Sequence, residues 1–327
     1  MDSPVSERYS RQVVLPEVGA GGQARLAAAS VAVVGAGGLG CAVLPYLAAA
    51  GVGRLTIVDH DCVAESNLHR QPLYRMSDLG ALKAGAARAA LLALNPAVHI
   101  DTWSERLTPA NAGVLAAAAD VIVDAADSFG VTYALSDACQ EARKPLVSAS
   151  VLALSGYVGA FCGGAPSYRA VFPELPRQAG SCAQSGVLGT AVGVMGTLQA
   201  HLTLSLLLKL EPPVLGRLLS VDFRTLHVGE VSFARAREPD ERFAFIAPQQ
   251  VTAADLVIDL RGLAEAPVSP FPAALRIGVE ALEQGDTPLP QASRIVLCCR
   301  TGVRAWRAAR ALGARGHHDV ALIALGE

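Results

Sequence analysis

A glycine-rich run near the N-terminus is the first segment whose residue types and spacing suggest chemistry. Its letters, GAGGLG at 35–40, match the pattern G-x-G-x-x-G. Glycines let the backbone approach phosphate groups closely, and the start of a helix attracts anions. Asp59 follows about 20 residues later, where an acid commonly accepts hydrogen bonds from ribose hydroxyls. The run predicts a nucleotide or dinucleotide site, although a tight turn that binds nothing could carry the same letters. The glycines facing phosphate would be Gly35, Gly37, Gly38 and Gly40.

Two cations and an acid further along favour a triphosphate over a dinucleotide. Arg70 lies in the segment SNLHRQ (66–71), and Lys83 follows one helix later. A triphosphate needs more positive charge than a dinucleotide, and these two side chains could supply it. Asp127 follows the apolar run ADVIVD (119–124), at the carboxyl end of a predicted strand, where ligands collect in such sheets. A carboxylate there can hold Mg²⁺, so ATP and Mg²⁺ are the predicted cofactors.

A second reactive segment lies near the C-terminus. Cys299 follows an apolar run and begins the loop CRTGVR (299–304), after which a helix is expected. Backbone N–H groups of such a loop, together with Arg300 and Arg304, would stabilise a thiolate or a persulfide. Strand alternation predicts that the neighbouring Cys298 points into the core. A degenerate loop kept only for docking is the competing interpretation.

Strand and helix signals alternate through most of the chain. This alternation predicts a doubly wound, Rossmann-like α/β fold with a mostly parallel sheet. Two further runs, 154–161 and 221–231, alternate in polarity and are expected to add antiparallel strands. The expected parallel strands are 30–35, 54–59, 98–102, 119–124 and 145–150, and the expected helices include 82–94 and 132–142.

A dense charged stretch, RAREPDER at 235–242, is the predicted linker between two domains. It separates a larger domain (1–234) from a smaller α/β domain (243–327). In the smaller domain, strands are expected at 256–260, 294–298 and 320–325, and a helix at 302–315.

Composition excludes several classes of protein. A net charge of −2 gives no reason to expect nucleic-acid binding, and 52% hydrophobic residues can bury a large core. The uncharged segment 187–208 is as long as a membrane span, but it contains Gln199 and His201, so a buried or interfacial helix is expected instead. The polar N-terminus and the seven scattered cysteines predict a cytoplasmic protein with reduced thiols.

The motifs together resemble the ThiF/MoeB group of adenylyltransferases, which are relatives of the ubiquitin-activating enzymes. The resemblance covers about residues 7–233. The segments that carry it are RYSRQ (8–12), GAGGLG, Asp59, SNLHRQ, Lys83 and GVMGTLQA (193–200).

This resemblance implies the reaction and the residue roles. The C-terminal glycine carboxylate of a small ubiquitin-like sulfur carrier protein would attack the α-phosphorus of ATP, leaving an acyl-adenylate. Asp127 would organise Mg²⁺ and the reacting phosphate, and Arg11 would reach the ATP of the partner in a homodimer. The implied nucleotide contacts, besides the glycines, are Asp59, Ser66, Asn67, Arg70, Lys83, Asp127 and Ser128.

The chain departs from the group's pattern at two places. Asp127-Ser128 stands where relatives commonly have Asp-Asn. Many relatives also hold a structural zinc ion with two C-x-x-C pairs, but 166–170 contains no cysteine and no C-x-x-C occurs elsewhere. Because tetrahedral zinc needs four good ligands, no zinc site is predicted.

The C-terminal part, about 243–327, resembles a rhodanese domain, mainly through the Cys299 loop. This implies sulfur transfer through a Cys299 persulfide, loaded by a donor such as a cysteine desulfurase, to give a carrier thiocarboxylate. Cys182 aligns with a cysteine that some relatives are thought to link to the carrier, and it could equally have no essential role. The alternatives are an NAD-dependent oxidoreductase and a non-catalytic module that binds ubiquitin-like proteins. The carrier's pathway is not determined by the sequence.

Overall fold

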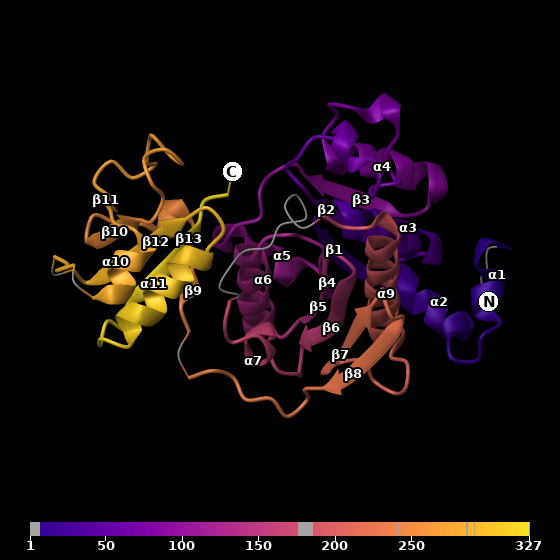
Figure 1. Ribbon diagram of the computed structural model, residues 1–327. Helices are drawn as coiled ribbons and strands as arrows, with labels where there is room; N and C mark the ends of the chain where they lie inside the picture. The colour runs from indigo at the N-terminus through magenta and orange to yellow at the C-terminus, as the bar shows by residue number, and fades with distance from the viewer. Residues whose placement is uncertain (1–6, 176–185, 241, 286, 291, 327) are drawn as a thin grey trace.

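The chain forms two β-sheets, each with its own helices, as the computed structural model in Figure 1 shows. The structure describes residues 7–175, 186–240, 242–285, 287–290 and 292–326. The first sheet has eight strands in the order β3-β2-β1-β4-β5-β6-β7-β8. Its parallel strands are β1 (Ser30–Val34), β2 (Arg54–Val58), β3 (His99–Trp103), β4 (Val121–Asp124) and β5 (Pro145–Leu152). Its antiparallel strands are β6 (Ser155–Cys162), β7 (Arg217–Asp222) and β8 (His227–Ser232).

Helices cover both faces of this sheet, which confirms the doubly wound prediction. Alternate residues of β1 belong to different apolar clusters: Val31 and Val33 pack on one face, Ala32 and Val34 on the other. Parallel strands buried on both faces read as continuous apolar runs, as β1 and β4 do. The first face carries α2 (Gly19–Ala28), α3 (Gly38–Ala50), α4 (Lys83–Leu94) and α9 (Gly189–Leu208). The second carries α5 (Pro109–Ala118) and α6 (Phe129–Ala142).

Among the described residues, α9 alone is long and apolar enough to cross a membrane, judged by length and composition. More than half of its most apolar stretch is buried inside the protein. Gln199, on this helix, is fully buried and donates from Nε2 to the Asp124 carbonyl oxygen at 2.7 Å. These contacts are those of a core helix, as expected from its polar residues.

The second sheet is parallel throughout and has five strands in the order β11-β10-β12-β13-β9. It begins after β8, with no further strand between Ser232 and Ala244 among the residues described. Its strands are β9 (Ala244–Phe245), β10 (Asp255–Asp259), β11 (Leu275–Arg276), β12 (Arg294–Cys299) and β13 (Val320–Ala324). Its helices are α10 (Val279–Gln284) and α11 (Val303–Gly313).

The two units pack together through one continuous apolar cluster, which contains α5 and α6 from the first unit and α10 and α11 from the second. Tyr133 of α6 lies 5.7 Å from the ring of Trp306 and 6.1 Å from that of Phe245. A large apolar interface disfavours relative motion of two units. In Figure 1, α6 accordingly stands on the side of the first unit nearest the second sheet.

Polar contacts stabilise the segment 166–170, where many members of the resembled group have the first cysteine pair of their zinc site. Ser167 donates its N–H and hydroxyl to the Glu238 carboxylate at 2.7 and 2.6 Å. Arg169, on α7 (Tyr168–Val171), is almost completely buried and donates to both oxygens of Asp137 at 2.6 and 2.8 Å and to the Phe243 carbonyl oxygen at 3.2 Å. These contacts tie Glu238 and Phe243 to the first unit.

Candidate active site at the carboxyl edge of the first sheet

The glycine-rich loop joins β1 to α3, and its geometry requires glycine at two positions. Gly35 has φ +98°, and a Cβ there would lie 2.6 Å from the Ala125 carbonyl oxygen. A Cβ on Gly40 would overlap the Gly35 carbonyl group. Gly37 is the N-cap of α3, so the loop presents backbone N–H groups at a helix N-terminus. The loop has the form that the sequence predicted, and its chemistry suits a phosphate group.

Asp59 is held beside this loop. It follows β2 and accepts the Ala36 N–H at 2.7 Å and the Asp61 N–H at 2.8 Å, one on each carboxylate oxygen. Each oxygen keeps a free lone pair for a hydroxyl donor. Burial raises the pKa of Asp59, and the two backbone hydrogen bonds oppose that rise. The arrangement suits recognition of a ribose by a fixed carboxylate.

The SNLHRQ segment lies against the glycine-rich loop. The position of a Cβ on Gly38 is 3.6 Å from the Arg70 carbonyl oxygen and 3.7 Å from Arg70 Cγ. Arg70 is half-buried and donates from Nη1 to the Ser66 carbonyl oxygen at 3.2 Å. In the same segment, Ser66 is exposed and Asn67 is half-buried. The structure therefore brings Arg70 to the loop, as predicted.

Two further residues at the loop were missed by sequence reasoning. Tyr74 is buried and donates its hydroxyl to the Ala36 carbonyl oxygen at 2.6 Å. Gln71 is also buried, with its Nε2 3.7 Å from the position of a Cβ on Gly37, and its Oε1 has no hydrogen-bond partner within the described chain. A buried amide oxygen without a partner marks a place where a ligand or water completes the site. The final Gln of SNLHRQ was the available signal.

Lys83 begins α4 and points toward the same edge of the sheet. Its stem is buried, and Nζ donates to Asp61 at 2.9 Å. Burial alone would raise the pKa of Asp61, but the hydrogen bond and charge of Lys83 outweigh it and the pKa is lowered. The partner in this ion pair, Asp61, is two residues after Asp59 in the sequence, so the pair holds the Lys83 ammonium group at the end of the site that contains Asp59. Lys83 is therefore placed where an incoming phosphate chain can compete with Asp61 for its charge.

The loop after β4 reaches the site from the other side. Asp127 is exposed, and Ser128 is the N-cap of α6. The Ala125 carbonyl group, two residues earlier, packs against Gly35, so this loop and the glycine-rich loop are neighbours. An exposed carboxylate at the phosphate end of the site fits Mg²⁺, which commonly binds one or two carboxylates and phosphate oxygens. Asp59, His60 and Asp61 are a second group with three ligand atoms within 4.8 Å of one another.

Asp124 lies beneath this loop and gives a pH prediction. It is fully buried, accepts the Ser148 hydroxyl at 2.9 Å, and burial raises its pKa from 3.8 to about 6. The folded protein therefore binds this proton more tightly than the unfolded chain, and stability from this group is gained as the pH falls from 6 towards 4. That shift corresponds to about 3 kcal/mol.

Asp124→Asn is expected to remove that gain. In urea unfolding, the free energy of unfolding of the parent protein relative to the variant should rise by about 2 kcal/mol between pH 7 and pH 4. Measuring the difference between the two proteins cancels the titration of all other carboxyl groups. Parallel pH profiles for the two proteins would show that Asp124 is not the group responsible.

Two predicted site residues are not brought together with the others. Arg11 is exposed on α1 (Ser10–Val13), whose neighbour Gln12 donates to the Ala50 carbonyl oxygen at the far end of α3. Since α3 has 13 residues, that end is about 20 Å from the glycine-rich loop. Arg11 therefore lies away from the site of its own chain. Cys182 lies outside the described residues.

The Cys299 loop is built as the sequence predicted, but its thiol is covered. The Gly302 N–H donates to Cys299 Sγ at 3.1 Å, and α11 begins at the next residue. Both Cys298 and Cys299 are fully buried, on opposite faces of the sheet. Alternation correctly placed Cys298 in a core and Cys299 on the opposite face, which is also covered, by α11 and by the first unit.

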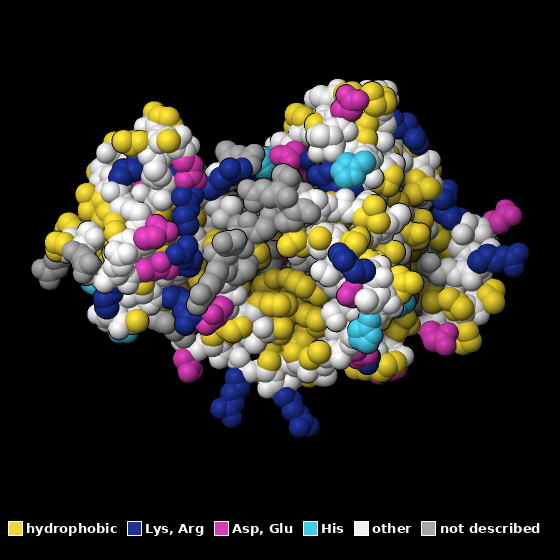
Figure 2. Space-filling view, in the orientation of Figure 1, with side chains coloured by type: hydrophobic (Ala, Val, Ile, Leu, Met, Phe, Trp, Pro, Cys, Tyr) yellow, Lys and Arg dark blue, Asp and Glu magenta, His cyan; other side chains and the backbone are white. Residues whose placement is uncertain are grey.

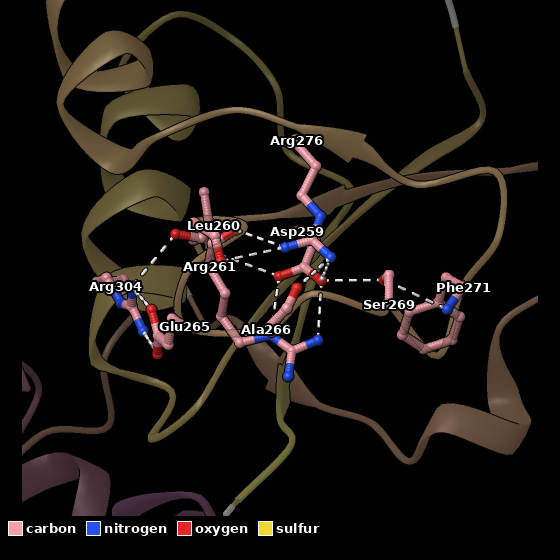
Figure 3. A network of polar contacts seen from close by, with 10 residues as sticks. Asp259, Leu260, Arg261, Glu265, Ala266, Ser269, Phe271, Arg276 and Arg304 are labelled. Atoms are coloured by element: carbon pink, nitrogen blue, oxygen red, sulfur yellow. Dashed lines mark hydrogen bonds and ion pairs between the residues drawn. The ribbon is translucent and has the colours of Figure 1, made fainter.

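A polar network joins the end of β10 and the segment after it to Arg304 on the first turn of α11, as Figure 3 shows. Arg304 donates to both oxygens of Glu265, at 2.7 and 2.5 Å, and to the Leu260 carbonyl oxygen at 3.3 Å. Buried Asp259 accepts Arg261 at 3.0 and 2.8 Å and the Ser269 hydroxyl at 2.9 Å. Glu265 is the main cause of the raised pKa of Arg304, and the nearby Cys299 contributes. The cationic group beside the thiol is thus held in place.

Comparison with known proteins shows which family the first unit matches. A sequence model described as the ThiF family matches residues 9–243. The "Adenylyltransferase and sulfurtransferase MOCS3" of Bos taurus is 48% identical over 241 residues, which are 71% of this chain and 52% of that protein. The chain thus spans about half the length of this relative and of the similar animal proteins.

A bacterial relative is matched over more of its length. The "Sulfur carrier protein adenylyltransferase" of Thermus thermophilus is 45% identical over 224 residues, 66% of this chain and 83% of that protein. Among solved structures, that of E. coli MccB has a TM-score of 0.64 at 21% identity, covering 74% of this chain and 76% of that one. Likeness at this identity concerns the fold, and it agrees with the predicted Rossmann-like class.

Proposed function

The chain belongs to the ThiF family, and on that premise we propose that it adenylates the C-terminal glycine carboxylate of a small ubiquitin-like sulfur carrier protein with ATP. The names of its relatives in cattle and in Thermus thermophilus describe this class of reaction. The observation that carries the proposal is the meeting of the glycine-rich loop, Asp59 and buried Lys83 at one edge of the first sheet. A nucleotide fits there, since Gln71 leaves a buried amide oxygen without a partner in the described chain.

Each residue of the site has a physical task in this reaction. The N–H groups of Gly37 and Gly38 and the start of α3 would bind phosphate oxygens, and Asp59 would bind the ribose hydroxyls. Arg70 and Lys83 would neutralise charge on the phosphates as the carrier's carboxylate oxygen attacks the α-phosphorus and pyrophosphate leaves. Such fixed charges account for much of the rate in phosphoryl-type transfers. Mg²⁺, held by Asp127 with Ser128 beside it, would supply further neutralising charge.

The position of Arg11 supports a homodimer in this proposal. Because Arg11 lies about 20 Å from the site of its own chain, it could act only in a second copy. There it would serve as an arginine finger on the partner's ATP. The proposed setting is the cytoplasm, where the exposed thiol of Cys62 would stay reduced.

The second unit would carry the sulfur. We assign residues 1–234 to the adenylyltransferase domain, 235–242 to a linker and 243–327 to a rhodanese-like domain. A donor protein such as a cysteine desulfurase would pass sulfur to Cys299 as a persulfide. Its terminal sulfur would attack the acyl carbon and release AMP, forming an acyl disulfide; a dithiol would then reduce this bond and free the carrier thiocarboxylate. Cys182 is the other candidate for a covalent link to the carrier.

Carrier-dependent exchange of labelled pyrophosphate into ATP tests the proposal. The probes are recombinant ubiquitin-like sulfur carriers that end in glycine, each assayed with Mg²⁺ present and with EDTA. Exchange is expected with at least one carrier and should disappear when its terminal glycine is amidated, since no carboxylate then remains to attack. An NAD-dependent oxidoreductase, or a module that only binds ubiquitin-like proteins, would show no exchange with any carrier, and that result would reject adenylation.

A further inference from the structure

Cys299 lies on the face of the second sheet that packs against the first unit. Its cluster contains Tyr133 and Leu135 of α6, whereas Cys298 belongs to a separate cluster on the other face. The side chain therefore lies on the face that is covered both by α11 of its own unit and by α6, the helix that starts at the nucleotide site. This orientation results from strand register, in which Cys299 pairs with Ala324 of β13.

The Cys299 loop and the start of α6 share the same two neighbours. A Cβ on Gly302 would lie 2.7 Å from the Phe245 ring and 3.6 Å from Ala324 Cβ. A Cβ on Gly130 would lie 2.7 Å from Ala324 Cβ and 3.6 Å from the Phe245 ring. Gly130 is three residues after Asp127 in the sequence. The side chains of Phe245 and Ala324 thus contact both the thiol loop and the first turn of α6, which follows the loop that carries Asp127.

A second contact joins the same two edges independently. A Cβ on Gly326, just after β13, would overlap the guanidinium group of Arg106. Arg106 in turn lies 3.0 Å from Nε2 of His60, the residue after Asp59, and Gly326 donates its N–H to the Arg300 carbonyl oxygen at 2.8 Å. The carboxyl ends of β2 and β4 therefore meet the carboxyl ends of β12 and β13.

The seam between these edges is narrow. Its cavity holds about 40 Å³ and is lined by Arg106, Ser128, Gly130, Phe245 and Ala324 among others. Figure 2 shows Lys and Arg side chains gathered over α11, on the edge of the second unit that faces the first. Since Cys299 is fully buried, side chains around it must move before a carrier tail can reach the thiol.

We propose that Cys299 serves the nucleotide site of its own chain, so that one chain carries out both adenylation and sulfur transfer in cis. The inference rests on the proposed function. The terminal sulfur of the Cys299 persulfide displaces AMP from the acyl-adenylate made at Lys83 and Asp127 of the same chain. The new bond is between the acyl carbon and sulfur, the bond that breaks is between the acyl carbon and the AMP oxygen, and a dithiol later reduces the acyl disulfide.

Mixed variants test this proposal. Lys83→Met removes adenylation from one chain, and Cys299→Ala removes the sulfur carrier from another. The two are mixed as purified proteins and also co-expressed with different tags and purified through both. The matched control is the wild-type chain treated in the same way with a chain that carries both substitutions. Carrier thiocarboxylate is measured by mass spectrometry after loading by a cysteine desulfurase with cysteine, with ATP, Mg²⁺ and a dithiol present.

Transfer in cis predicts that the mixture of single variants makes about 10²-fold less thiocarboxylate than the control mixture, because no chain in it is complete. Equal product from the two mixtures would overturn the proposal and show that Cys299 acts on the adenylate of another chain. Absence of product from wild-type protein alone would instead reject sulfur transfer by this chain. Variants are compared only after their circular dichroism spectra match the wild type.

Discussion

Replacing Lys83 with methionine is expected to slow carrier-dependent ATP–pyrophosphate exchange by about 10²–10³-fold, the effect of removing one charge-stabilising donor from an active site. Methionine fills the buried channel occupied by the lysine stem but carries no charge. Asp61, left without its partner at 2.9 Å, would also repel the triphosphate. Asp61 is exposed enough to remain solvated, so the fold should persist.

Lys144 provides the matched control. It directly precedes β5, at the amino end of a parallel strand, and so lies at the opposite edge of the sheet from the site. Lys144→Met should leave exchange within about twofold of the wild type, as expected for a surface charge outside the site. Equal losses in the two variants, or none in Lys83→Met, would remove Lys83 from the proposed mechanism.

Gly40→Ala is expected to destabilise the protein and abolish exchange together. The new methyl group would overlap the carbonyl group of Gly35, with the carbonyl carbon 2.9 Å away. Both atoms are backbone, so α3 would have to shift away from β1. Overpacking of this kind costs about 3 kcal/mol at the upper end of its usual range. The same shift would widen the loop that is proposed to hold the phosphates.

Gly85→Ala separates this clash from the general effect of the substitution. Gly85 lies within α4, and a Cβ there meets no atom within 4 Å. Alanine is favoured over glycine in a helix, so this variant should be more stable by about 1 kcal/mol. Urea unfolding of both variants measures the contrast. Similar midpoints for the two would contradict the close approach of α3 to β1.

The parallel strands could be predicted because each is buried on both faces. The runs at 30–35 and 119–124 became β1 and β4, and the alternating run at 154–161 corresponds to β6. The run at 221–231 is not one strand: it contains the end of β7, a turn at 223–226 and most of β8. Shorter elements could not be predicted. β9 and β11 have two residues each, so they carry no periodicity, and their partners on β13 and β10 are distant in sequence.

The candidate site also contains some residues that could be predicted from the sequence and others that could not. Gly40, Asp59 and Lys83 were found because local spacing determines their place at the carboxyl edge of the sheet. Tyr74 and Gln71 were missed, since their role depends on how the segment 66–74 folds back on the loop. Burial of Cys299 was also missed. Alternation placed it opposite Cys298, but whether that face is exposed depends on how α11 and α6 pack against it, which local pattern does not show.

The most direct test follows the fate of one oxygen atom. A sulfur carrier whose C-terminal carboxylate contains heavy oxygen is incubated with the protein, ATP, Mg²⁺ and a persulfide donor, and the released AMP is analysed by mass spectrometry. If the carboxylate attacks the α-phosphorus, its oxygen leaves with the nucleotide, and the account predicts AMP that carries the heavy label. Release of unlabelled AMP, or of ADP, would contradict adenylation of the carrier.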